Sequence, residues 1–218
     1  MFEKHRAKKA LKEYQVALAA WQAERDGCAH LLETALHFEG TGADGLQLGP
    51  GEAVFFQVTR AALIEERRGA GQWQGHSAGV SIPIGSLGGH SVRYRVGTTR
   101  GHYVQGTPAP TAIDTGTVYV TNQRVVFEGE SQTRECRFAK LLGYQHSDGD
   151  GSTTFSVSNR QKPVTLHYGP HLSGAFDFRL DLALAHCHGT VPDLVGRLTQ
   201  DLGRIDGMRP SSPPTPPS

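Results

Sequence analysis

The stretch that decides the fold is Gly116-Thr-Val-Tyr-Val-Thr-Asn-Gln-Arg-Val-Val-Phe-Glu-Gly129. Two short runs of β-branched and aromatic residues flank a polar Thr-Asn-Gln-Arg bend. Such residues favour strands, and a polar bend between two such runs is typical of a β-hairpin. The stretch therefore predicts a hairpin with strands at Thr117–Thr121 and Arg124–Glu128.

Further strand-like segments lie on both sides of this hairpin. Turn-forming residues at 148–151 and 159–162 predict that the strands from about 117 to 168 form an antiparallel meander, as in a small closed or nearly closed barrel. Residues 61–66 are expected to be the strand that returns from 53–59, although their Ala-Ala-Leu-Ile-Glu-Glu sequence is also compatible with a helix. The other predicted strands are Gly79–Ile84, Ser91–Val96, Arg134–Phe138, Gly143–Ser147, Thr153–Ser158 and Pro163–Tyr168.

The N-terminal region, Glu3–Phe38, has the composition of a helix. It contains no proline, and Gly27 is its one helix breaker, so we expect one long helix or two helices that meet at Gly27. Apolar residues recur at a spacing of three and four, as in a coiled-coil seam. This stripe predicts either packing on the protein's own domain or a partner-helix interface in a homodimer, with Leu11, Tyr14, Leu18 and Trp21 as the contact residues.

Two helices are expected near the C-terminus. Residues 173–189 place Phe176, Leu180, Leu184 and Cys187 at helical spacing, and residues 191–205 form a second amphipathic segment after Thr190. Residues 207–218 end in Pro210–Ser218, which is rich in proline and contains no apolar anchor. They predict a disordered, solvated tail, with a proline-rich docking motif as the alternative.

The central hairpin resembles that of bacterial GRAM and pleckstrin-homology-like domains, in which a strand ending in Thr-Asn-x-Arg turns into an apolar strand ending in Phe-x-Gly. The matching residues are Thr121, Asn122, Arg124, Phe127 and Gly129. The resemblance covers residues 115–168 and extends to the helix ending near Gly189. It implies an α+β fold, mainly antiparallel, in which a barrel or two nearly orthogonal sheets are capped by the C-terminal helix. It also implies a domain that binds lipid headgroups, peptides or partner proteins and is not an enzyme.

Composition restricts the class of partner and the compartment. Lys and Arg number 22 against 21 Asp and Glu, so the whole chain lacks the strong positive field that gathers nucleic acid. The 3 cysteines are far apart and form no CxxC pair, which favours a reducing cytoplasm. We expect no signal peptide and no transmembrane segment, so that any membrane contact is peripheral.

Residues 67–114 form a glycine-rich and arginine-rich insertion without a counterpart in the family pattern. Between Arg67 and Ile113 the sequence has no Asp, Glu or Lys. Guanidinium groups suit phosphate and carboxylate, so an acid-free segment that contains them predicts an anion site. The candidate ligand-binding residues are Arg67, Arg68, Trp73, His76, Arg93, Arg95, Arg100, His102 and Tyr103. The alternative is a solvated structural surface.

Alternation in Val92–Val96 places Arg93 and Arg95 on one strand face. The segments 68–75 and 100–106 share an Arg-Gly pair followed by an aromatic residue and a glutamine between glycines. This similarity predicts two loops that face each other.

Catalytic and metal sites are not predicted. His186 and His188 are two residues apart on a predicted helix and so diverge, and Gly169-Pro170 separates His167 from His171. Cys187 has no base and orienting acid marked beside it. An unrecognised hydrolase or metal enzyme that uses the histidines remains as an alternative.

The expected organisation is a helical arm (1–40), a linker (41–51), a pleckstrin-homology-like β domain (52–206) and the proline-rich tail (207–218). We expect a cytoplasmic, non-catalytic binding module without cofactor or metal, which recognises a partner protein or an anionic lipid or peptide. The alternative is a structural protein that assembles through its N-terminal helix.

Overall fold

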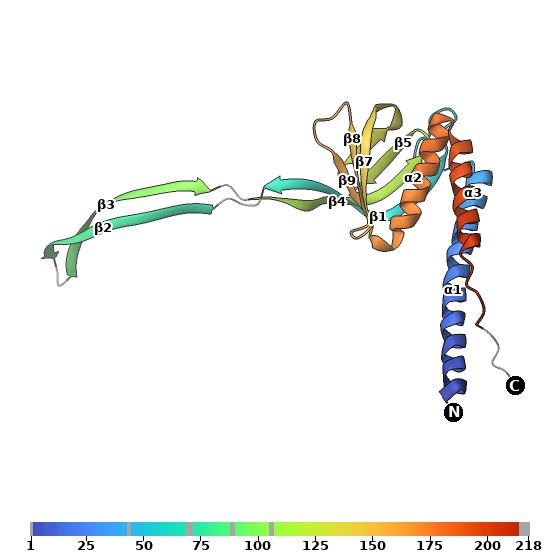
Figure 1. The fold of residues 1–218 in the computed structure, drawn as a ribbon. Coiled ribbons are helices and arrows are strands. Elements are labelled where there is room, and N and C mark those ends of the chain that lie inside the picture. The colour runs from blue at the N-terminus through green and yellow to red at the C-terminus, as the bar shows by residue number, and fades with distance from the viewer. Residues whose placement is uncertain (1, 43–44, 69–71, 88–89, 105–106, 214–218) are drawn as a thin grey trace. The chain divides into compact units, whose positions relative to one another are not determined.

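A computed structural model describes residues 2–42, 45–68, 72–87, 90–104 and 107–213 (Figure 1). The chain divides into two compact units, the first made of Met1–Leu63 and Asp114–Ser218 and the second of Ile64–Ile113. The helices are α1 (Phe2–His37), α2 (Ser173–His188) and α3 (Val191–Gly207), with short 3-10 turns η1 (Phe138–Lys140) and η2 (Pro170–Leu172). The strands are β1 (Val54–Arg68), β2 (Gln72–Leu87), β3 (His90–Val104), β4 (Pro108–Thr121), β5 (Arg124–Gly129), β6 (Thr133–Arg137), β7 (Leu141–Ser147), β8 (Ser152–Val157) and β9 (Val164–His167).

The central hairpin is confirmed as β4 and β5. Val118 pairs with Phe127, and Val120 pairs with Val125. All four side chains are buried. Its two flanking glycines also pair with each other. They allow close backbone approach, because a Cβ at Gly116 would collide with the carbonyl of Glu128.

Seven strands form one antiparallel sheet in the order β6-β5-β4-β1-β9-β8-β7. The edge strands β6 and β7 are joined by the three residues of η1, so the sheet curls until its two edges approach at this corner. The described residues show no ladder between β6 and β7, and the sheet is not closed into a barrel. The α+β fold class is therefore confirmed, with a single open, curled sheet.

β1 corrects one prediction. Residues 53–66 are not two strands that double back, because β1 runs without interruption from Val54 to Arg68. Arg60 has φ of 59°, a left-handed conformation, and the alternation of buried residues changes at this position, from which we infer a β-bulge. Val58 is buried before it and Ala61 after it, so the extra residue shifts which positions face the core. The helical alternative for 61–66 is wrong as well.

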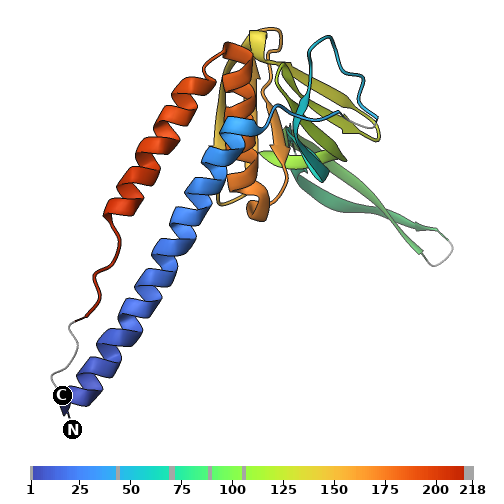
Figure 2. The ribbon, with the colours of Figure 1, turned by 90° about the vertical axis from the view of Figure 1, so that its right-hand side faces the viewer.

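The N-terminal helix is continuous through Gly27, where an added Cβ would meet nothing within 4 Å. α2 covers the sheet, because Phe176 stacks on Tyr168 with ring centroids 4.1 Å apart and Leu180 is fully buried. Gly189, with φ of 69°, ends α2 in a left-handed cap. Figure 2 shows α3 running along α1, as the contacts of Trp21 and Arg25 with the end of α3 require.

The insertion differs from the prediction of glycine-rich loops. β2 and β3 pair as an antiparallel two-stranded sheet, from Gln72 opposite Val104 to Leu87 opposite His90. The predicted strands 79–84 and 91–96 lie inside these longer strands. The register shifts between Pro83 and Gly85, as expected where proline lacks the amide hydrogen of a regular ladder.

Candidate functional site

The predicted anion-binding residues lie on three strands of the insertion. Arg67 is exposed near the end of β1, and Arg68 is the last residue of that strand. Trp73 and His76 lie on β2. The remaining members, Arg93, Arg95, Arg100, His102 and Tyr103, all lie on β3. We refer to β2 and β3 together as the β2–β3 ribbon.

The two similar segments of the insertion lie opposite each other as strands. Trp73 is the register partner of Tyr103, and His76 is the partner of Arg100. The sequence alone shows the similarity of residues 68–75 and 100–106 but predicts loops at both segments. Glycines inside them hid the strand pattern, because glycine is a weak strand former.

The register also divides the candidate residues into two sets. Positions that face each other in an antiparallel pair share a face, and successive positions alternate. Arg93 and Arg95, opposite Pro83 and Ser81, therefore fall on a different face from Arg100. Arg95 and Tyr103 share a face but are eight residues apart, about 26 Å along a strand. The structure thus spreads the candidates along the ribbon and does not gather them into one pocket.

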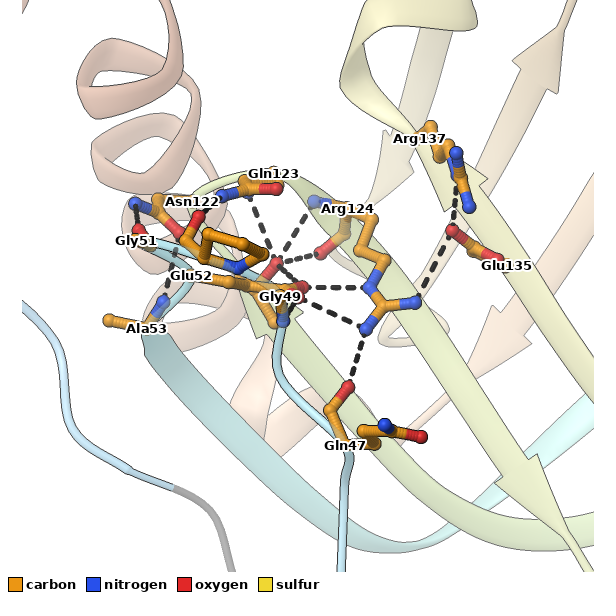
Figure 3. Close-up of polar contacts among 12 residues, drawn as sticks. Gln47, Gly49, Gly51, Glu52, Ala53, Asn122, Gln123, Arg124, Glu135 and Arg137 are labelled. Carbon is orange, nitrogen blue, oxygen red and sulfur yellow. Dashed lines mark hydrogen bonds and ion pairs between the residues drawn. The ribbon is translucent and has the colours of Figure 1, made fainter.

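A second polar site lies in the first unit, at the turn of the central hairpin (Figure 3). Its members, Glu52, Thr121, Arg124 and Glu135, are called the Glu52 cluster. The Glu52 side chain is 2% exposed and accepts hydrogen bonds from Arg124 Nε at 2.7 Å and from Thr121 Oγ1 at 2.8 Å. Arg124 also donates to the carbonyl of Gln47 and lies 3.4 Å from Glu135.

These contacts determine the ionisation of Glu52. Burial alone would raise its pKa, but hydrogen bonds from Arg124, the Gly49 amide and Thr121 hold the pKa below the ordinary 4.5. The Arg124 pKa is raised, chiefly by its hydrogen bond to Glu52. The cluster is therefore an ion pair at the pH of a cell.

The neighbouring turn residues also connect the bend to the 47–53 segment. Asn122 accepts from the Ala53 amide at 3.0 Å and donates to the Gly51 carbonyl, while Gln123 donates to the carbonyl of Pro50. Every polar side chain of the Thr-Asn-Gln-Arg bend thus binds the 47–53 segment or its own turn. The bend therefore fixes the 47–53 segment, which leads into β1, through side-chain hydrogen bonds. The sequence analysis missed Glu52, which lies 69 to 72 residues from its partners.

A third polar cluster contains serine, histidine and aspartate. His146 Nε2 lies 2.8 Å from Ser173 Oγ and 3.2 Å from Asp148 Oδ1, and its Nδ1 lies 3.0 Å from Thr153 Oγ1. A catalytic triad needs the carboxylate on the other imidazole nitrogen from the serine. Here the Ser173 hydroxyl and the Asp148 carboxylate both lie beside the same nitrogen, Nε2. Ser173 is also only 4% exposed. The arrangement anchors the start of α2 to β7 and β8 and does not form a triad.

Of the other chemistry-bearing residues, Cys136 is buried and Arg179 is half-buried, whereas Cys187 is exposed near the end of α2, so its predicted place on the buried stripe of this helix is wrong. Burial raises the pKa of the Cys136 thiol to about 11 and also raises that of Cys187. The Arg179 guanidinium lies 4.3 Å from the centre of the Phe38 ring, and its pKa is lowered by burial. Within the described ranges, no three His, Cys, Asp or Glu residues are grouped so that they could hold a metal ion.

Of the residues predicted to contact a partner helix, Trp21 packs on α3 of the same chain, whereas the three before it are half-buried or exposed. The Trp21 indole donates to the Ile205 carbonyl at 2.7 Å, and Arg25 pairs with Asp206 at 2.7 Å, so this part of α1 packs on α3 of the same chain. Tyr14 and Leu18 are half-buried, and Leu11 is 48% exposed. Packing on the protein's own domain thus accounts for the C-terminal part of the stripe.

No described helix is both long enough and apolar enough to cross a bilayer. Comparisons with family models, curated proteins and solved structures found no match to the chain.

Proposed function

We propose that this protein is a non-catalytic binding module that recognises a phosphate-bearing surface through the β2–β3 ribbon and the residues that lead into it. The observation that carries the proposal is the charge of residues 67–113, which include five arginines and no acidic residue. In this reading the protein belongs with GRAM and pleckstrin-homology-like domains, as the resemblance of the central hairpin implies.

The distribution of the arginines favours an extended ligand. A small anion needs several donors within a few ångströms of one another, whereas the register spreads these residues along strands of 15 and 16 residues. An anionic bilayer presents many phosphates along the length of the ribbon, and each arginine within reach of its surface potential, on either face, contributes about 1 kcal/mol. A lipid surface is therefore favoured over a single phosphopeptide.

The other polar sites support this assignment by exclusion. Arg124 already has Glu52 and Glu135 as partners, and the His146 cluster has no exposed nucleophile. Residues 67–113 contain no such carboxylate within their own sequence.

The experiment is flotation of the full chain with phosphatidylcholine vesicles that contain 0% or about 30% phosphatidylserine, at several salt concentrations. The Arg93→Ala/Arg95→Ala/Arg100→Ala variant should bind the anionic vesicles about 100-fold more weakly, from about 1 kcal/mol per arginine. The matched control is Arg160→Ala/Lys162→Ala/Arg197→Ala, which removes three exposed cations from the other unit. Equal binding by the two triple variants would refute the proposal, and binding to a phosphopeptide alone would replace the lipid with a peptide.

A further inference from the structure

The N-terminal part of α1 carries an apolar face that α3 does not reach. The two helices are antiparallel, since Cys28 contacts the Leu198 carbonyl and Trp21 contacts the Ile205 carbonyl. α3 ends at Gly207, two residues after Ile205. Leu11 lies ten residues before Trp21, about 15 Å further along α1 at about 1.5 Å per residue. The face of Leu11, Tyr14 and Leu18 therefore continues beyond the end of α3.

The chain that follows α3 starts beside this face. The Arg209 guanidinium lies 5.6 Å from the centre of the Trp21 ring. A pocket of about 500 Å³ lies at the same place, lined by Trp21, Gln22, Arg25, Asp26, Asp206 and Arg209. The proline-rich segment thus leaves α3 next to an aromatic side chain.

Burial along the segment has the period of an extended proline helix. Pro210 and Pro213 are half-buried, whereas Ser211 and Ser212 between them are exposed. A polyproline II helix has three residues per turn, so Pro210 and Pro213 lie on the same side. In this conformation residues 208–213 span about 19 Å at about 3.1 Å per residue, which exceeds the distance of about 15 Å from Trp21 to Leu11.

We propose that the segment Met208–Pro213 packs in an extended conformation along the face of α1 formed by Leu11, Tyr14, Leu18 and Trp21. Proline rings pack well on aromatic and aliphatic side chains, and a polyproline segment loses little conformational freedom when it binds. Beyond Arg209 the segment contains no charged residue, so the lysines around this face do not repel it.

Charge argues against a second copy of α1 as the occupant. The exposed Lys8, Lys9 and Lys12 border this part of the helix, and Glu13 is the acidic residue nearest to them. Lys9 lies 3.8 Å from Glu13, which leaves Lys8 and Lys12 as excess positive charge. Two such helices packed in parallel and in register would bring these like charges together, which is destabilising. The chain's own tail avoids that repulsion.

Hydrogen exchange of the α1 amides tests the proposal in the full chain. Removal of residues 208–218 should speed the exchange of amides 8–18 about fivefold, as expected when a cover is removed from a locally opening helix. Pro210→Ala/Pro213→Ala should give part of this effect. The control Ser211→Ala/Ser212→Ala changes exposed positions of the same segment and should give none. A synthetic peptide of residues 208–218, added to the shortened chain, should restore the slow exchange.

Two results would overturn the proposal. One is equal exchange of amides 8–18 in the full and shortened chains. The other is a full chain that is dimeric by sedimentation and becomes monomeric in the Leu11→Ser/Tyr14→Ser variant, because a second copy would then cover the face.

Discussion

Two hairpins of this protein use arginine in opposite ways. In the β4–β5 hairpin, Arg124 lies between Glu52 and Glu135, and the polar residues of the bend are held by backbone groups of the 47–53 segment. In the β2–β3 ribbon, arginines occur within 47 residues that contain no acid. A guanidinium with built-in carboxylates stabilises the fold, whereas a row of guanidiniums without nearby acids in sequence is suited to an external anion. The difference predicts that Arg124 is needed for folding, whereas the arginines of the ribbon can be removed without loss of the fold.

The largest expected effect is on the stability of the first hairpin. Glu52→Ala should lower the free energy of unfolding by about 3 kcal/mol or more, because it leaves a largely buried Arg124 without its main partner. Urea denaturation followed by circular dichroism measures this change. Arg137→Ala removes a cation whose side chain is 64% exposed and should cost less than about 1 kcal/mol. Similar losses in both variants would contradict the structural role of the Glu52 cluster.

The second expectation concerns pH. The pKa of Glu52 is below 4.5 in the folded protein, so its ionised form contributes stability above the pKa of the unfolded chain, and this contribution is lost as the pH falls through the lower folded value. Glu52→Gln removes that dependence. The stability difference between wild type and Glu52→Gln should be largest near neutral pH and shrink below pH 4.5. A difference that stays constant with pH would contradict this assignment.

A smaller effect is expected at the bulge in β1. Arg60 has a left-handed backbone conformation, which a β-branched residue adopts with difficulty. Arg60→Val should destabilise the protein by about 1 to 2 kcal/mol, and Arg60→Gly should be tolerated. Thermal unfolding of both variants tests this expectation. Equal melting temperatures would mean that the bulge is not required for the packing of Ala61 and Leu63.

The smallest effect on stability is expected in the ribbon. Arg93→Ala/Arg95→Ala should leave the free energy of unfolding of the first unit within about 0.5 kcal/mol of wild type, as for surface residues in general. Urea denaturation followed through Tyr and Trp fluorescence provides the measurement. A loss as large as that of Glu52→Ala would assign these arginines to the fold and remove the contrast between the hairpins.

Sequence alone predicted the elements whose signals are local. The β4–β5 hairpin, the strands from β4 to β9 and the helices α1, α2 and α3 follow from periodicity and turn residues within short windows. The continuous meander predicted for 117–168 is wrong in one respect, because in the part of the chain that the structure describes β6 and β7 do not pair and β1 lies between β4 and β9. The bulge at Arg60 was not predictable, because nothing in Ala53–Glu66 marks a positive φ without glycine. The strands 79–84 and 91–96 of the ribbon were predicted, but the glycine-rich parts at 72–75 and 100–104 were mistaken for loops, since their pairing is decided by register across about 30 residues.

Prediction of sites was limited for the same reason. The candidate anion residues could be named from charge, but their division between two faces depends on a register that the sequence does not show. Glu52 was missed because its partners lie about 70 residues away. The resemblance of Thr121, Asn122 and Arg124 to a family motif located the bend, and the structure explains why these polar residues occur together.

The central place of β1 has a consequence for synthesis on the ribosome. β1 lies between β4 and β9, and 100 residues separate Leu63 from Val164, where β9 begins. The apolar row of β1 therefore leaves the exit tunnel long before one of its two ladder partners has been translated. Chains of high contact order fold slowly and expose unpaired strands meanwhile. The nascent first half of this protein is thus the stage at which aggregation competes most strongly with folding.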